Sequence, residues 1–100
     1  MTVLEAHVAQ EQWSALVAAY EAGNKNLPSP MVQTLLVQDT ADRTLWRGIS
    51  IWHSREALQE YRGSVETPGG VLMFRSAGAE PSLAIFEVAS HAERGAAQAS

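Results

Sequence analysis

The sequence predicts an α+β domain with one antiparallel sheet, and three observations support this fold class. Four segments have the short apolar pattern of β-strands. Between the first and second of these, and again between the third and fourth, the apolar spacing becomes helical. The chain of 100 residues is long enough to bury one compact core and too short for two. We therefore expect a single domain built from two β-α-β halves.

The first third of the chain is predicted to form a strand, a helix and a loop. Residues 2–8 alternate between two faces, which favours a strand. Within residues 10–22 the apolar side chains recur at helical spacing. They form one stripe of Trp13, Leu16, Val17 and Tyr20. Gly23 suits the end of this helix because glycine tolerates the left-handed conformation, and the two prolines in residues 24–30 prevent either element from continuing.

A hairpin and a second helix follow. Residues 31–39 and 44–52 are predicted strands, joined at residues 40–43 by a polar connection of hairpin length. Ser54 suits the N-cap of the helix, because a serine hydroxyl accepts a hydrogen bond from a free backbone N–H of the first turn. Gly63 is the predicted end of this helix.

The last third is predicted to contain a short helix, a strand and a tail. The Thr67–Pro68 pair suits the start of a helix that the next two glycines weaken. Residues 82–90 are the predicted final strand. Residues 92–100 lack apolar periodicity and are a predicted mobile tail, so the predicted domain spans residues 1–91.

The resulting order is β-α-β-β-α-β, with a minor third helix before the last strand. This order is typical of the ferredoxin-like plait, a four-stranded antiparallel sheet with its helices on one face. Right-handed crossovers place the first strand beside the third. We expect these two neighbours to run parallel.

Composition excludes several classes of protein. The net charge is −4 and the seven Lys and Arg residues are scattered, which disfavours binding to nucleic acid. No apolar run approaches the roughly 18 residues of a membrane-spanning helix, and no signal peptide opens the chain. Without cysteine there is no disulfide and no thiolate ligand or nucleophile. We expect a cytoplasmic protein that contacts neither nucleic acid nor membrane.

The open face of the predicted sheet is too apolar to face water. The second, third and last strands each have apolar side chains on both faces, whereas a solvated face is polar at alternate positions. A patch of that size needs a cover, and the simplest cover is the same sheet of a second copy. Two sheets meeting in this way form either a small-molecule pocket or a packed interface without a cavity. The pattern does not choose between them.

One segment resembles a known family. Leu45–Tyr61 (LWRGISIWHSREALQEY) contains a strand ending in Trp-x-Ser and a helix that opens with acidic, Ala and Leu residues. With the closing LAIFEV, it resembles the antibiotic-biosynthesis-monooxygenase-like (ABM) domains of the dimeric α+β barrel superfamily, over about residues 2–90. The resemblance implies a homodimeric barrel. Family members include small oxygenases that use no flavin, metal or haem and oxidise polycyclic phenols to quinones, so no cofactor is expected.

The sequence departs from the family pattern at several positions. Tyr61 stands where many members have a histidine near the end of the second helix. The haem-degrading branch carries an Asn-Trp-His set, whereas the first strand here offers Glu5 and His7, and the third-helix region (GGVLMFRS) has no histidine. These departures argue against haem degradation.

The histidines are the candidates for acid–base chemistry near neutral pH. None of His7, His53 and His91 lies at metal-ligand spacing from another, so no metal site is expected. The predicted topology places His7 and His53 at one end of the sheet and His91 at the other. His7 shares a strand face with Glu5, which suits a general base for a phenol. The alternative is a polar strand-end residue that faces water.

Four further residues are candidates for binding a substrate. Trp46 and Trp52 share a strand face, and flat aromatic rings suit stacking on a polycyclic ligand; plain packing is the alternative. Arg47 either binds an anionic oxygen or forms an ion pair with a glutamate. Tyr61 either donates a hydrogen bond into a cavity or belongs to the core.

We therefore predict a cofactor-independent monooxygenase that oxidises a small hydrophobic molecule, aromatic or enolic, with O2. In this hypothesis His7 removes a proton and the electron-rich anion reduces oxygen, while the tryptophans exclude water. The alternative is a non-catalytic small-molecule-binding or orphan dimeric barrel protein. A cavity with polar groups would favour the first hypothesis, and a filled interior the second.

Overall fold

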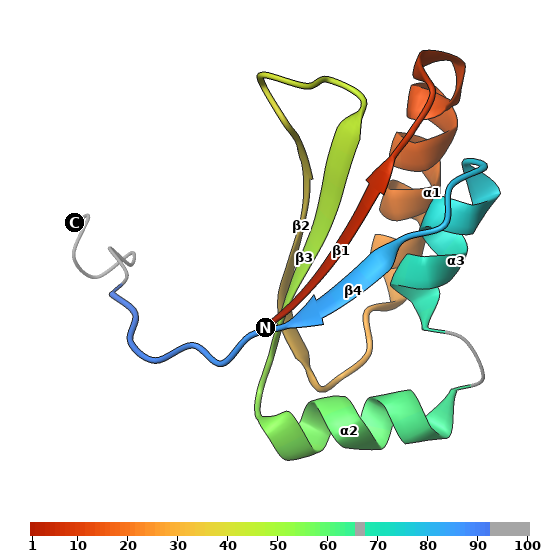
Figure 1. Ribbon diagram of the computed structural model, residues 1–100. Coiled ribbons are helices and arrows are strands. Elements are labelled where there is room, and N and C mark those ends of the chain that lie inside the picture. Colours follow the sequence, from red (N-terminus) through yellow and green to blue (C-terminus); the bar gives the residue numbers. More distant parts are fainter. Residues whose placement is uncertain (66–67, 93–100) are drawn as a thin grey trace, which may run out of the picture.

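The computed structural model describes residues 1–65 and 68–92, which form one sheet with helices on one side (Figure 1). In chain order the elements are β1 (Thr2–His7), α1 (Trp13–Gly23), β2 (Met31–Gln38), β3 (Leu45–Trp52), α2 (Arg55–Ser64), α3 (Gly69–Ser76) and β4 (Ser82–Ile85). Two short 3-10 turns, η1 (Gln10–Gln12) and η2 (Asn24–Asn26), flank α1. This is the ferredoxin-like α+β order predicted from the sequence, including the minor third helix.

The sheet has the strand order β2-β3-β1-β4, so the prediction that the first strand lies beside the third is confirmed. The predicted direction is wrong, because β1 and β3 are antiparallel. A right-handed crossover makes β2 follow the direction of β1, and the hairpin then reverses β3. Every neighbouring pair in the sheet is antiparallel.

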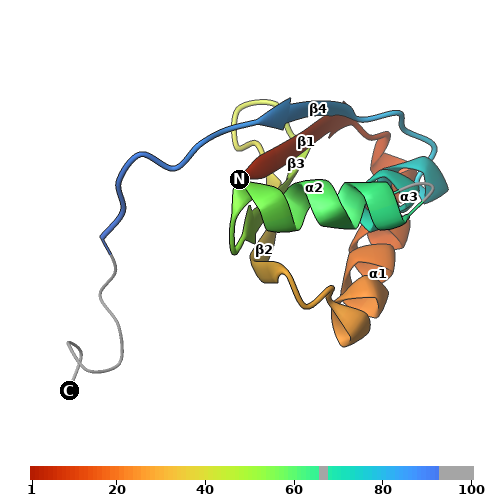
Figure 2. The same cartoon turned by 90° about the horizontal axis from the view of Figure 1, so that it is seen from below.

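The helices cover only one face of this sheet. Figure 2 shows α1 and α3 side by side beneath the strands, while α2 runs across one end of the sheet (Figure 1). The N-cap predicted for α2 is confirmed, because Ser54 Oγ accepts a hydrogen bond of 3.0 Å from the backbone N–H of Ala57. For α3, the predicted start at Thr67 lies outside the described residues, and the helix itself begins at Gly69.

The hydrophobic core fills the space between the sheet, α1 and α3. Phe74 and Leu16 have no exposed surface, and Val8 is 1% exposed. The indole rings of Trp13 and Trp46 meet edge-on across this core, with centroids 6.0 Å apart and planes at 63°. The core therefore joins the end of β1 to α1 and α3, and it leaves the region near α2 less densely filled.

The last strand is shorter than predicted. β4 ends at Ile85 because its neighbour β1 begins at Thr2. The final backbone contact is with Met1, which exchanges hydrogen bonds of 2.7 and 2.8 Å with Phe86. Beyond that point no strand remains to pair with. The tail predicted at residues 92–100 lies outside the described residues from position 93 onward.

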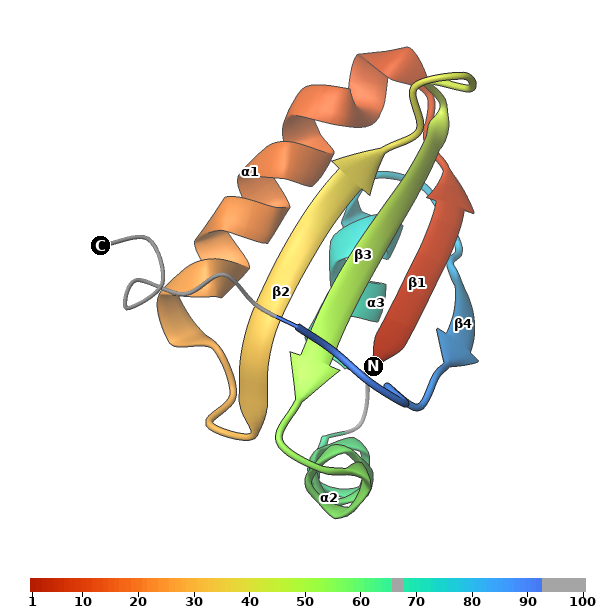
Figure 3. The same cartoon turned by 90° about the vertical axis from the view of Figure 1, so that its left-hand side faces the viewer.

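In the described part of the chain no helix or strand covers the face opposite the helices, and the segment that follows β4 passes in front of one end of it (Figure 3). Cross-strand pairing aligns Leu35, Ile49, Val3 and Ala84 in one apolar row across all four strands. Leu35 is 43% exposed, and the other members of the row are half-buried or exposed. The sequence prediction of an apolar open face is thus confirmed within the described residues.

Met31 departs from the simple alternation of side chains expected along residues 31–39. An irregularity in the β2–β3 register between Met31 and Gln33 places an extra residue in β2. Such a bulge shifts the side-chain alternation by one position. Met31 consequently pairs with Trp52 and lies on the helix side of the sheet, not beside Leu35 as simple alternation predicts.

The β2–β3 connection is closed by one carboxylate. Asp39 Oδ1 accepts hydrogen bonds of 2.8 Å from the backbone N–H groups of both Ala41 and Asp42. These two bonds, to Asp42 and then Ala41, together with the nearby Arg47 guanidinium, lower the pKa of Asp39 below its ordinary value. A lowered folded-state pKa contributes stability above the unfolded pKa, and that stability is lost as pH falls through the folded value.

We expect Asp39→Asn to reduce the loss of stability on acidification. As pH falls, the unfolded chain binds a proton at Asp39 more readily than the folded chain, whose Asp39 pKa is lowered, and this favours unfolding; an asparagine side chain does not titrate. Urea unfolding at pH 7 and at pH 3 measures the difference for each variant. Glu60→Gln on the exposed side of α2 is the control. An equal drop in wild type and Asp39→Asn would contradict the role of Asp39.

Candidate small-molecule site

A cavity of about 330 Å³ lies on the helix side of the sheet. Its floor is formed by β1, β2 and β3, and its walls by the end of α1, the η2 turn, α2 and the start of α3. The floor residues are Leu4, Met31, Thr34, Gly48 and Ser50. This volume lies within the range of small-molecule sites in proteins, which starts at about 300 Å³.

The lining is uncharged, with a few hydroxyl and amide groups. Tyr20 Oη donates a hydrogen bond of 3.1 Å to the backbone carbonyl of Thr34, and Ser50 Oγ lies 3.5 Å from Thr34 Oγ1. Asn24 and Asn26 add exposed amides from the η2 turn. An apolar cavity with few polar groups is the usual composition of a site that binds a largely apolar molecule and orients it.

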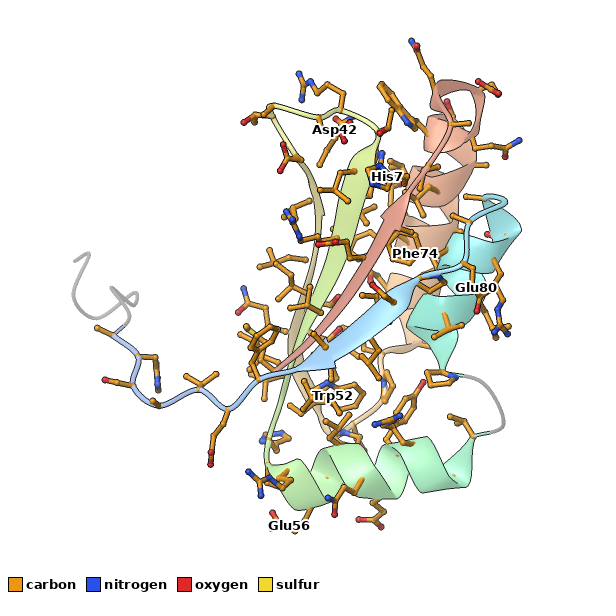
Figure 4. The ribbon with its side chains drawn as sticks, in the orientation of Figure 1. His7, Asp42, Trp52, Glu56, Phe74 and Glu80 are labelled. Carbon is orange, nitrogen blue, oxygen red and sulfur yellow. The ribbon has the colours of Figure 1, made fainter. Side chains whose placement is uncertain are left out.

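A second, smaller cavity of about 70 Å³ adjoins the first. The two share Leu4, Met31, Ser50, Tyr61, Gly69 and Gly70. Trp52 and Tyr61 form an aromatic pair in the wall, with ring centroids 5.0 Å apart and planes inclined by 36°. Figure 4 shows Trp52 between the end of the sheet and α2. The aromatic pair therefore stands where the two cavities meet.

Two glycines bring α3 close to this junction. A Cβ on Gly70 would lie only 2.6 Å from Leu4 Cδ1, so a larger residue there would require the Leu4 side chain to turn aside. The backbone N–H of Gly69 donates a hydrogen bond of 3.3 Å to Tyr61 Oη. These two glycines weaken the helix, and its first turn forms part of the site.

The structure brings together two of the predicted site residues and separates the others. Trp52 and Tyr61 both line the small cavity, and Tyr61 also lines the large one. Trp46 is on the same strand face as Trp52 but lies in the core, 7% exposed, against Trp13. Its indole N–H is buried without a hydrogen-bond partner among the described residues. Trp46 lines neither cavity.

Arg47 lies on the open face of the sheet. Its Nε donates a hydrogen bond of 2.6 Å to Glu5 Oε2, which confirms the predicted alternative of an ion pair with a glutamate. Asp39 Oδ2 lies 3.6 Å from Nη1 of the same guanidinium. The hydrogen bond to Glu5 raises the pKa of the Arg47 guanidinium above its ordinary value. Arg47 therefore lies outside both cavities, and its predicted role in binding stays a prediction.

His7 also lies outside the cavities, at the opposite end of β1 from α2 (Figure 4). Its side chain is 68% exposed, with Nδ1 3.0 Å from Thr44 Oγ1 and 3.6 Å from Asp42 Oδ2. The carboxylate beside His7 is therefore that of Asp42 and not Glu5. The geometry tests neither reading of His7, the general base or the polar strand-end residue that faces water.

The predicted grouping of the histidines is wrong. His7 pairs with Leu45 at the start of β3, whereas His53 follows the end of β3, so these two lie at opposite ends of the sheet. His91 continues from the β4 end that lies beside Thr2. The error follows from the reversed direction of β3.

Across residues 1–65 and 68–92 no three His, Cys, Asp or Glu side chains cluster as metal ligands.

Sequence reasoning did not identify Thr34, Gly48 and Ser50 as part of a site. These three residues share the helix-facing side of β2 and β3 with large apolar residues. Small residues at inward-facing strand positions were the available signal, because they leave volume that neither core nor helix fills.

In the described part of the chain no helix has the length and apolarity needed to cross a bilayer.

Comparison with protein-family models and with curated protein sequences finds no match. Solved structures do match. SnoaB, a cofactor-independent oxygenase from Streptomyces nogalater, has a TM-score of 0.63 at 16% identity, over 90% of this chain and 92% of that one. An antibiotic biosynthesis monooxygenase has a TM-score of 0.62 at 12% identity, over 89% and 98%. A conserved protein of unknown function from Bacteroides thetaiotaomicron has a TM-score of 0.64 at 18% identity, over 87% and 94%.

These similarities establish the fold. The chain has the ferredoxin-like α+β fold of the antibiotic-biosynthesis-monooxygenase-like domains, and the resemblance noted in the sequence is confirmed at that level. The same fold hosts different functions, so the activity has to be argued from the cavities and the residues around them.

Proposed function

We propose that the chain is a cofactor-independent monooxygenase that oxidises a flat phenol or enol inside the large cavity. The observation that carries this proposal is the uncharged cavity of about 330 Å³, with Tyr61 in its wall and the Trp52 ring packed against Tyr61 in the adjoining smaller cavity. A flat aromatic molecule matches these aromatic and aliphatic walls. The fold shared with a cofactor-independent oxygenase supports the same class of reaction.

The reaction uses the substrate as its own reductant. The substrate hydroxyl lies against Tyr61 Oη and gives its proton to solvent water at the open side of the cavity, and the resulting anion transfers electrons to O2. One oxygen atom enters the ring carbon and the other leaves as water, so that anthrone and O2 give anthraquinone and H2O. The apolar walls limit access of bulk water to the radical and peroxide stages.

We also propose that a second copy of the chain covers the open sheet face. The apolar row through Ile49 and Val3 spans all four strands, and among the described residues no helix or strand lies over it (Figure 3). Monomeric soluble proteins seldom expose an apolar patch that extends across a sheet. A dimer joined by these faces leaves the two helix-side cavities accessible, one in each copy.

Replacing Tyr61 by phenylalanine tests the placement of the substrate. We expect oxygen consumption with anthrone to fall by about 10-fold or more, because the hydroxyl that orients the substrate is lost while the ring is retained. The measurement is the initial rate of O2 uptake above the uncatalysed rate. His53→Ala, at an exposed position outside both cavities, is the control. Unchanged uptake in Tyr61→Phe would contradict the proposal.

The same assay decides the role of His7. Loss of a general base costs about 10²-fold or more in rate, so a base at this position would be evident in His7→Ala. Because the His7 ring is exposed and lines neither cavity, we expect the uptake rate of this variant to match that of wild type. A hundredfold loss would instead assign the base to His7.

A ligand-binding protein without catalytic activity is the second candidate. The observation that favours it is the scarcity of proton-transfer groups, since tyrosine and arginine are the only titratable types among the described residues that line the two cavities. Calorimetric titration with anthraquinone separates the candidates. Binding without anthrone-dependent O2 uptake would support the binding protein.

A further inference from the structure

The smaller cavity has the size and lining of a site for a small apolar molecule. Its volume of about 70 Å³ exceeds the share of one water molecule in the liquid, about 30 Å³, but is far below that of the neighbouring cavity. Most of its wall is hydrocarbon. The apolar residues are Leu4, Met31, Leu58, Pro68, Val71 and Leu83.

Three of the polar side chains in this wall have a hydrogen-bond partner within the chain, and Ser50 Oγ lies 3.5 Å from Thr34 Oγ1. Trp52 Nε1 donates a hydrogen bond of 3.1 Å to Thr2 Oγ1, and Thr2 is 8% exposed. Tyr61 Oη accepts the hydrogen bond from Gly69. The side chain of Arg62 is exposed, so its charge remains in solvent at the edge of the cavity. An ordered water needs two to four polar partners, and these walls offer few.

The smaller cavity is also next to the proposed substrate position. Its boundary with the large cavity includes Tyr61, Gly69 and Gly70. A molecule held there would be adjacent to a ring that lies against Tyr61. Apolar protein cavities bind uncharged, polarisable species such as xenon in preference to water.

We propose that the smaller cavity binds dioxygen and holds it beside the substrate ring. Its use as a co-substrate site rests on the proposed oxygenase function, whereas the binding of an apolar gas does not. Dioxygen is small, uncharged and a weak hydrogen-bond acceptor, so it matches a wall that is mostly hydrocarbon. The position at the junction explains why one chain has two adjoining cavities of such different size.

Xenon is the probe for gas binding, and crystals of the full chain under xenon pressure give its position. We expect xenon in the smaller cavity of wild type, and its loss in Val71→Phe, whose larger side chain fills the space. Leu72→Phe is the matched control, because Leu72 is the next residue of α3, is 53% exposed and lines neither cavity. Leu83→Phe on β4 is a second filling variant, in case Val71→Phe does not fold.

The kinetic measurement is the KM for O2 at saturating anthrone. We expect a filling variant to raise it about tenfold, as changes in the size of an apolar pocket do, without changing the KM for anthrone. Absence of xenon from this cavity would overturn the proposal. A raised KM for anthrone with an unchanged KM for O2 would also overturn it, because the cavity would then hold part of the organic substrate. If no variant consumes O2, the proposed function fails while the xenon result still decides gas binding.

Discussion

Replacing Phe74 by alanine is expected to lower the free energy of unfolding by about 3–5 kcal/mol, the cost of a buried phenylalanine-to-alanine change. Phe74 has no exposed surface and belongs to the core cluster with Leu16 and Val8. Its ring also passes beneath Gly48, where a Cβ would lie 3.5 Å from Phe74 Cε2. Truncation therefore leaves a void at the centre of the sheet–helix interface. Urea unfolding followed by far-UV circular dichroism gives the difference.

Leu72→Ala is the matched control for this measurement. Leu72 lies two residues away on α3 and is 53% exposed, so its truncation removes little buried surface. We expect a change within about 0.5 kcal/mol, as for surface substitutions in general. Equal losses for the two variants would mean that α3 does not pack on the sheet through Phe74.

Replacing Ile49 by lysine is expected to convert the proposed dimer into a monomer. Ile49 lies in a central strand, between Leu35 and Val3, in the apolar row of the open face. Pairing two such faces would bury two ammonium groups in an apolar contact, which is strongly unfavourable unless each is paired. Sedimentation velocity across a concentration series measures the population of dimer.

The control places the same lysine on the other side of the molecule. Leu72→Lys changes an exposed residue of α3, which packs on the opposite face of the sheet (Figure 1). We expect this variant to remain dimeric. A monomeric wild type, or a dimer unaffected by Ile49→Lys, would contradict the proposed covering of the open face.

Local patterns were sufficient to predict most of the fold. Turn residues and the change of apolar spacing located the strands and helices, since these signals act over a few residues. The pattern of residues 82–90 overestimated the last strand, because pairing depends on where β1 begins and not on the residues of β4 themselves. The predicted direction of β3 was wrong because β2 follows the direction of β1 and the hairpin then reverses the chain. This error also placed His7 and His53 at the same end of the sheet.

The candidate site was harder to predict than the fold. Trp52 and Tyr61 were identified because aromatic residues suit a cavity wall, and they do meet there. Thr34 and Ser50 were not, because small residues at inward-facing strand positions mark a cavity only once the helices are placed against the sheet. The cavity exists through contacts between distant segments. Gly70 allows α3 to approach Leu4, and the irregularity in β2 turns Met31 toward the helices.

The three tryptophans occupy two different environments, and this gives the chain two separate optical signals. Trp13 and Trp46 lie against each other in the core, so their emission reports the loss of the packed interior on unfolding. Trp52 stands in the wall of the smaller cavity, beside Tyr61, where an aromatic molecule bound in the adjoining large cavity would quench it. With Trp52 replaced by phenylalanine, the remaining emission follows folding alone. The difference between the two proteins then follows occupancy of the site.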